Sequence, residues 1–211
     1  MKKLVSTLFA ASLMLIGINA FAQVSVNAGY LNSTQSFKDA NTKSVNSNGV
    51  FAGVSYNIPL AGGFGFAPGV YYSMITKKNE SSGSFMGTTI SSSSTFMEHA
   101  LNAPLYLNYG IDLNRDTRIF IYGGPTLQFG LSSTTKIAGG IGEYSGDNTL
   151  DNYDDLDYNR FNVYLGGGVG FQMSVVQITL GYDYGMANLY KGDNAIGPHR
   201  SNLKLGIGYV F

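Results

Sequence analysis

Few residues of this 211-residue chain have the chemistry or spacing of a catalytic or metal-binding site. The absence of cysteine excludes disulfides, thiolate metal sites and cysteine nucleophiles. His99 and His199 lack the spacing of a metal-binding pair, so we expect them to be ordinary interface and loop residues. The serines from Ser81 to Ser94 lie in a Ser/Gly/Thr-rich loop without a G-x-S-x-G elbow. The sequence therefore predicts no catalytic residue, no metal ligand and no cofactor.

Carboxylates are concentrated in one segment, residues 137–159, which contains no Lys or Arg. Six of the 13 acidic residues lie there: Glu143, Asp147, Asp151, Asp154, Asp155 and Asp157. Together with nearby asparagines they could supply the hard oxygen ligands that Ca²⁺ or Mg²⁺ prefers, although the EF-hand order and its glycine are absent. The simpler interpretation is a solvated acidic surface loop.

Composition indicates a β protein that does not bind nucleic acid. The 13 basic and 13 acidic residues cancel, so no positive excess exists to neutralise phosphates. Only 12% of the residues are charged, while 28 Gly, 15 Tyr and 13 Phe are typical of many short strands joined by tight turns.

The N-terminal segment has the pattern of an export signal. Two lysines precede the apolar stretch from Leu4 to Ile16, and the small residues of an A-x-A site follow at Ala20 to Ala22. We predict a cleaved signal peptide over residues 1–22 and one mature domain over residues 23–211. No later apolar run is long enough for a spanning helix, so a mature chain in a membrane must cross it as a β-barrel.

Eight segments of the mature chain place apolar residues at every second position, as membrane-crossing strands do. They are residues 24–30, 50–58, 64–74, 98–109, 119–131, 161–173, 176–186 and 202–211. Long polar connections (38–47, 78–93, 134–159, 189–200) alternate with short ones (59–63, 110–117, 174–175). This pattern predicts an all-β, eight-stranded antiparallel up-and-down barrel with its long loops at one end. We expect a bulge at Pro68, Pro104 and Pro125, because proline lacks the N–H that a closed barrel needs.

The composition of the two strand faces indicates which one points outward. The non-apolar face is small as well as polar, with three glycines at Gly166, Gly168 and Gly170, and it carries almost no Lys or Glu. Aromatic residues on the apolar face lie at two levels, as expected for two membrane interfaces. We therefore expect the apolar face to meet lipid. The alternative is a soluble lipocalin-like barrel whose apolar residues line a calyx.

Four segments resemble the small outer-membrane β-barrel family that includes OmpX-like and PorT-like proteins. They are 101–110 (LNAPLYLNYG), 160–171 (RFNVYLGGGVGF), 180–189 (LGYDYGMANL) and 201–211 (SNLKLGIGYVF). The most specific element is the final alternation, which closes on an aromatic residue. In that family such an ending is read by the barrel-assembly machinery, and Tyr209 and Phe211 match it here.

The resemblance implies a protein of the outer membrane, surrounded by lipid and lipopolysaccharide, with long loops extracellular and short turns periplasmic. Members of the family differ in role, so adhesion, a secretion accessory and envelope stability all remain open as structural or surface-interaction functions. The alternatives are a narrow passive pore, a periplasmic carrier of apolar ligands, and an outer-membrane protease or lipase.

Charged residues on the small polar face should pair inside the barrel. If the last two strands place Val176 opposite Phe211, Asp183 lies directly opposite Lys204 on the interior side. A lone charge there is costly, whereas a pair is neutral. Two further residues from neighbouring strands, Glu98 and Arg118, are expected to join this structural charge cluster.

Overall fold

The computed structural model describes residues 23–36, 44–85, 88–141, 144–155, 158–188 and 199–211. Its elements are β1 (Gln23–Ser36), β2 (Val45–Pro59), the short 3₁₀ turn η1 (Ala61–Gly63), β3 (Phe64–Phe85), β4 (Thr88–Asp112), β5 (Thr117–Ile141), β6 (Tyr144–Asp151), β7 (Phe161–Met173), β8 (Val176–Gly185) and β9 (His199–Val210). The predicted signal peptide, residues 1–22, lies outside the described residues. Within them, no helix is long and apolar enough to cross a membrane.

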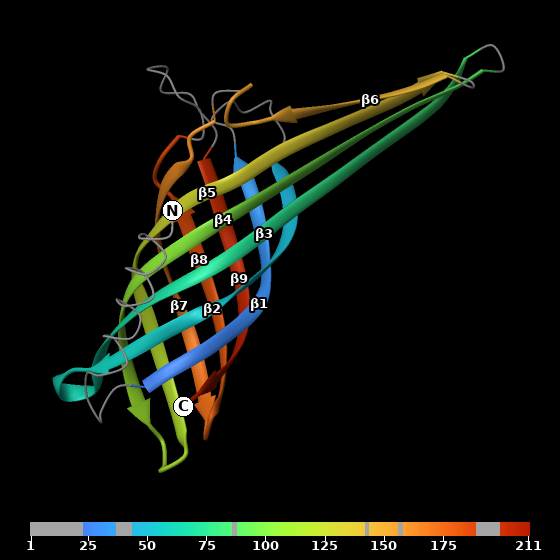
Figure 1. Cartoon of the computed structure of the whole chain (residues 1–211). Helices are drawn as coiled ribbons and strands as arrows, with labels where there is room; N and C mark the ends of the chain where they lie inside the picture. The colour runs from blue at the N-terminus through green and yellow to red at the C-terminus, as the bar shows by residue number, and fades with distance from the viewer. Residues whose placement is uncertain (1–22, 37–43, 86–87, 142–143, 156–157, 189–198) are drawn as a thin grey trace, which may run out of the picture.

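Eight of the strands close into an antiparallel ring (Figure 1). Each pairs with its neighbours in the order β1-β2-β3-β4-β5-β7-β8-β9, and β9 pairs again with β1. Among the described residues, β6 pairs with β5 alone and stays outside the ring. The predicted all-β, eight-stranded up-and-down barrel is confirmed.

At one end, β3, β4 and β5 run on past the ring and join β6 in a four-stranded sheet that leans to one side of the barrel (Figure 1). We call this extension, made of residues 77–85, 88–96, 134–141 and 144–151, the projecting sheet. Its strands pair in register from β3 through β4 and β5 to β6. A continuous set of hydrogen-bonded strands therefore joins the barrel to the projecting sheet.

The prediction that residues 78–93 and 134–159 are loops is wrong for most of both segments, because strands occupy residues 78–85, 88–93, 134–141 and 144–151. Serine, threonine, glycine and asparagine stand on both faces of these strands, so the sequence has no apolar alternation there. Pairing with a neighbouring strand satisfies their backbone groups even though neither face is apolar.

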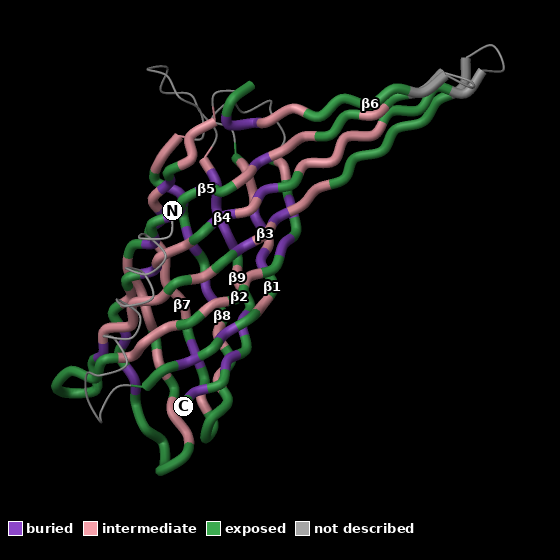
Figure 2. Tube along the Cα trace, in the orientation of Figure 1, coloured by how far each residue is buried: buried purple, intermediate pink, exposed green. Residues whose placement is uncertain are grey.

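The apolar face of the barrel points outward. Val70, Leu165 and Ile207 are 55%, 56% and 58% exposed, and most aliphatic side chains of the ring are exposed to a similar degree. Buried positions alternate with these along the strands (Figure 2), and most of them are polar, such as Asn27 and Gln128. An apolar surface of this extent is stable against lipid and not against water. The interpretation of an apolar calyx is therefore wrong for this chain.

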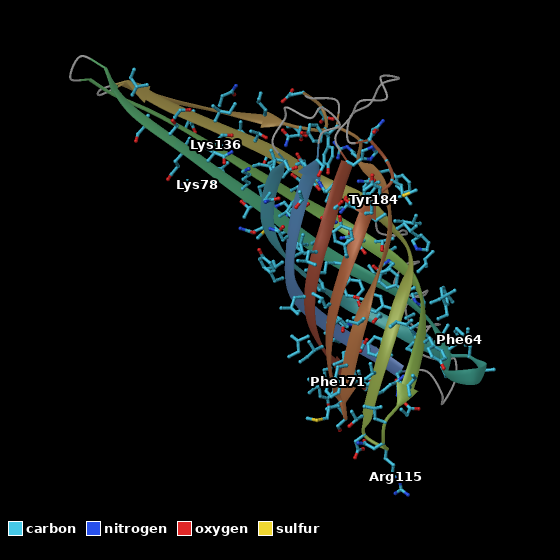
Figure 3. The ribbon with its side chains drawn as sticks, turned by 180° about the vertical axis from the view of Figure 1, so that it is seen from behind. Phe64, Lys78, Arg115, Lys136, Phe171 and Tyr184 are labelled. Carbon is cyan, nitrogen blue, oxygen red and sulfur yellow. The ribbon has the colours of Figure 1, made fainter. Side chains whose placement is uncertain are left out.

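The aromatic side chains on the outer surface lie at two levels. Figure 3 shows Tyr184 toward the end that bears the projecting sheet, and Phe64 and Phe171 toward the opposite end, where Arg115 lies. Tyr184 and Phe64 are about half exposed. This distribution matches the two aromatic girdles of a membrane barrel.

The three prolines leave the strand registers unchanged. Between β2 and β3, two residue pairs are missing from the ladder beside Pro68, and the same is true beside Pro104 between β4 and each of its neighbours. In each case the pairing resumes in the same register. Pro125 pairs with Leu165 without a shift. The predicted bulge at each proline is wrong, since skipped pairs already accommodate the missing N–H. The one register shift among the described pairings lies between His99 and Ala100, where β4 and β5 leave the ring.

Replacing Leu165 by arginine should destabilise the barrel by about 2–4 kcal/mol, because the charge would lie against hydrocarbon. The free energy of unfolding in lipid vesicles, measured by urea titration, checks this. Ile137→Arg is a matched control, since Ile137 is exposed (43%) but lies on the projecting sheet. An equal loss in both variants would contradict a lipid-facing Leu165.

Candidate functional site

The polar interior of the barrel contains a cross-barrel network, and Asp183 and Lys204 are part of it. Lys204 Nζ lies 2.5 Å from Asp183 Oδ2. The predicted register is wrong by two residues, because Val176 pairs with Tyr209, Asp183 with Asn202, and Lys204 with Gly181. A shift of two keeps each side chain on its face, so the long lysine side chain still reaches the carboxylate diagonally.

Tyr106 on β4 connects this ion pair to the opposite wall. Its hydroxyl accepts hydrogen bonds from Lys204 Nζ (3.1 Å) and Thr126 Oγ1 (3.0 Å), and it donates to Asp183 Oδ1 (3.1 Å). The one donor and both lone pairs of the hydroxyl are thereby used. The network spans the lumen from β8 and β9 to β4 and β5.

A second ion pair crosses the barrel nearer the projecting sheet. We call each of the two cross-barrel contacts, Lys204 with Asp183 and Tyr106, and Arg200 with Glu98, a strut. Arg200 on β9 donates through Nη1 to Glu98 Oε1 on β4, four strands away around the ring. The two side chains are 2% and 5% exposed. Glu98 is thus placed inside as predicted, but its partner is Arg200 and not the Asp183 pair.

Arg200 is not among the residues predicted to line the barrel, because residues 189–200 were expected to form a loop. The available signal was its position four residues before Lys204 in an alternating strand, which puts both side chains on one face. His199, expected in the same loop, is the first residue of β9.

Arg118 lies apart from both struts, at the short-turn end of the barrel. Its Nη2 donates to the Gly63 carbonyl (3.3 Å), and Nε lies 3.8 Å from Asp112 Oδ1. The prediction that Arg118 joins the Asp183 cluster is wrong. Arg118 is the second residue of β5, so it lies at the short-turn end of the barrel, away from Asp183. Of the four residues in the predicted cluster, the structure brings together Asp183 and Lys204.

Uncharged side chains extend the network around the wall. Tyr164 donates to Gln128 (3.0 Å), Gln128 to Asn102 (3.0 Å), and Asn102 to Ser73 (2.8 Å). This series of hydrogen bonds links β7, β5, β4 and β3. A cavity of about 160 Å³ remains in the lumen.

The segment that follows β6 folds back over the mouth of the barrel, and we call residues 151–155 the cap. Asn152 is buried, donates to Ser133 Oγ (2.9 Å) and accepts from Thr135 Oγ1 (2.8 Å). Tyr153 is also buried, and a Cβ at position 130 would collide with its hydroxyl, so Gly130 makes room for it. Burial raises the pKa of Tyr153 and the nearby Glu98 raises it further. The Tyr153 hydroxyl is therefore neutral at physiological pH.

The acidic residues of this region serve the cap and the projecting sheet. Asp151 Oδ1 accepts from the Tyr153 N–H (2.9 Å), and Asp155 Oδ2 accepts from the Asp151 N–H (2.8 Å). Asp154 pairs with Arg160, and Asp147 on β6 pairs with Lys136 at 3.1 Å. Glu143 and Asp157 lie outside the described side chains. Among the residues that the structure describes, no three His, Asp or Glu side chains gather as a metal site.

Both histidines stack on tyrosines of the outer surface. The His99 ring lies 5.9 Å from that of Tyr72, and the His199 ring lies 6.0 Å from that of Tyr184.

The C-terminal Phe211 donates its N–H to the Val24 carbonyl (2.9 Å) and packs edge-on against Tyr209. The role of Tyr209 and Phe211 as an assembly signal stays a prediction.

The chain is similar to known membrane barrels. A family model described as "Outer membrane protein beta-barrel domain" matches residues 12–191. Similar solved structures are Ail, the attachment invasion locus protein of Yersinia pestis (14% identity, TM-score 0.40, 90% of this chain and 99% of that one), Neisserial surface protein A (16%, 0.46, 89% and 97%) and the outer membrane enzyme PagL (10%, 0.43, 89% and 98%). No curated protein sequence matches the chain.

The contribution of the Asp183–Lys204 pair can be measured by a double-mutant cycle. Asp183→Asn and Lys204→Met should each destabilise the folded barrel by about 1–3 kcal/mol, because each leaves a buried charge with fewer partners. The double change should cost less than the sum, with a coupling of about 1 kcal/mol or more. Urea unfolding in vesicles provides the four free energies. Strict additivity would show that the two charges are stabilised independently.

Proposed function

Because the chain belongs to the outer membrane protein β-barrel domain family and lies in the outer membrane, we propose that it is a non-catalytic scaffold that presents the projecting sheet for binding at the cell surface. Lipid and lipopolysaccharide surround the apolar face of the barrel, and the short turns face the periplasm. The mature chain begins at Gln23 after removal of the signal peptide. Its partner outside the cell is bound by the projecting sheet.

The observation that carries this proposal is the pair of free edges on the projecting sheet. Among the described residues, β6 has a neighbour on one side only, and β3 has no partner toward β2 from residue 77 to 83. Unpaired backbone N–H and C=O groups on a strand edge accept an additional strand, which is a common mode of peptide recognition. Figure 1 shows these two strands as the outer edges of the projection.

A binding role is favoured over catalysis because the potentially reactive side chains are engaged in structural contacts. His99 and His199 stack on tyrosines at the outer surface, away from the carboxylates inside the barrel. Glu98 and Asp183 are engaged by cations across the lumen, and the described aspartates of the cap hold backbone N–H groups or an arginine. His99 Nδ1 is hydrogen-bonded to the Tyr72 hydroxyl, but among the described residues neither histidine is paired with a carboxylate that would orient it as a catalytic base.

A shortened variant tests the proposed binding role. Asn79, Ser94, Ile137 and Asn148 form one cross-strand row. Deleting residues 80–93 and 138–147, with an Asn-Gly turn closing each hairpin, removes the outer part of the projecting sheet and leaves the barrel strands intact. Decapeptides selected by phage display on the full-length protein in nanodiscs should bind it and fail to bind the shortened variant.

Hydrogen exchange identifies the site that such a peptide uses. A bound peptide should protect backbone amides of β6 or of residues 77–83. The double variant Lys78→Ala, Lys136→Ala is the matched control, because it removes exposed charges and keeps both edges. Equal binding to the shortened variant, or protection confined to the barrel, would contradict an edge-binding function.

The rival function is a narrow passive pore, and the cross-barrel network argues against it. Two struts and the cap lie in the path through the lumen, so purified protein in planar bilayers should show no steady, sizeable conductance. The Tyr153→Ala variant provides a control for closure by the cap alone. A reproducible large open channel in the unmodified protein would instead support the pore.

A further inference from the structure

The large apolar side chains of the projecting sheet lie on one of its two faces. In an antiparallel sheet, directly paired residues share a face and successive residues of a strand alternate between faces. Phe96 and Leu150 both pair with Thr135, one from each side. Ile137 lies two residues after Thr135 on β5, and Ile90 lies six residues before Phe96 on β4. All four large apolar side chains that the structure describes in the sheet therefore share a face.

The charged side chains of the sheet gather on the opposite face. Phe96 lies two residues before Glu98, whose side chain lines the lumen, so we call the apolar side the lumen-side face and the other the outer face. The outer face carries two exposed ion pairs, Lys78–Glu80 and Lys136–Asp147 (Figure 3). Of the charged residues described in the sheet, Lys77 alone lies on the lumen-side face. The two faces thus differ, although serine, threonine and asparagine are common on both.

The apolar side chains reach the edge formed by β6. Ile137 on β5 is the diagonal neighbour of Phe96 on β4 and of Leu150 on β6, close enough for side-chain contact. Ile137 is exposed, and the other two side chains are partly buried. Among the described residues, β6 pairs with β5 alone. A strand added beside β6 would therefore extend this apolar surface and cover Leu150.

We propose that β6 binds an extended polypeptide segment whose alternate residues are apolar, paired antiparallel to it. Residues of the segment opposite Leu150 and Asn148 project onto the lumen-side face, where apolar side chains pack on Leu150 directly and diagonally. Residues opposite Asp147 and Thr149 project onto the charged outer face and are polar. The other free edge, residues 77–83 of β3, carries no large apolar side chain, so the segment selects β6. This inference rests on the proposed edge-binding function and specifies the partner.

Two labelled octapeptides of identical composition test the pattern. One alternates Thr and Val, so its four Val lie on one face of a strand, whereas the isomer has its four Val in one central block and two on each face. The alternating peptide should bind the protein in nanodiscs about tenfold more tightly, the change expected from burial of one further Val-sized side chain. Fluorescence anisotropy at nanomolar peptide gives the two affinities, and hydrogen exchange should show protection of β6.

Two serine variants at neighbouring positions of β6 locate the contact. Leu150→Ser should lower the affinity for the alternating peptide to that for the isomer, because the apolar neighbour is lost. Thr149→Ser, on the outer face, is the matched control and should bind as the unmodified protein does. Unchanged exchange protection between β5 and β6 shows that the sheet is intact. If Leu150→Ser loses this protection, the comparison of the two peptides on the unmodified protein decides alone.

The outcomes separate this inference from the function on which it rests. Equal affinity of the two peptides, or an equal loss in both serine variants, would overturn the preference for an apolar pattern. If the displayed decapeptides still protect an edge of the sheet in that case, the edge-binding function stands. Absence of binding by the alternating peptide would also overturn the inference, and the displayed peptides then decide the edge-binding function separately.

Discussion

Closing eight strands into a ring sends every second side chain into a narrow lumen, and the charges among them must be neutralised there. Arg200 pairs with Glu98 on the far wall, and Lys204 with Asp183 and Tyr106. Lys204–Asp183 joins the neighbouring strands β9 and β8, whereas Arg200–Glu98 and Lys204–Tyr106 join β9 to β4, which is not its neighbour in the sheet. These two contacts hold opposite walls at a fixed separation. The interior network thereby stabilises the barrel.

Glycines make this interior possible by leaving space for large polar and aromatic groups. A Cβ at Gly170 would collide with the ring of Phe120, one at Gly181 with the Tyr122 hydroxyl, and one at Gly166 with the Asp183 carboxylate. The small face seen in the sequence is therefore complementary to large residues on facing or adjacent strands. Packing of this kind fills the lumen without adding charge.

Sequence alternation was sufficient to predict the eight ring strands and the outward direction of residues such as Leu165, because burial against lipid imposes a strict period of two. Register could not be predicted, since shifting β9 by two residues keeps Lys204 inside. The projecting sheet was missed because its strands are polar on both faces, so Lys78 and Thr95 carry no periodic signal. Arg200 was missed for a related reason. It is the second residue of β9, and residues 189–200 were expected to form a loop.

The geometry that links the barrel to the projecting sheet depends on one irregularity. β4 and β5 change register by one residue between His99 and Ala100, so Leu131 has no partner on β4. A bulge of this kind bends a strand and increases its local twist. It lies next to Glu98, where β4 leaves the ring and the projecting sheet begins to lean away (Figure 1). Since β3, β4 and β5 run unbroken through this point, the strut between Arg200 and Glu98 anchors the base of the projecting sheet to the barrel.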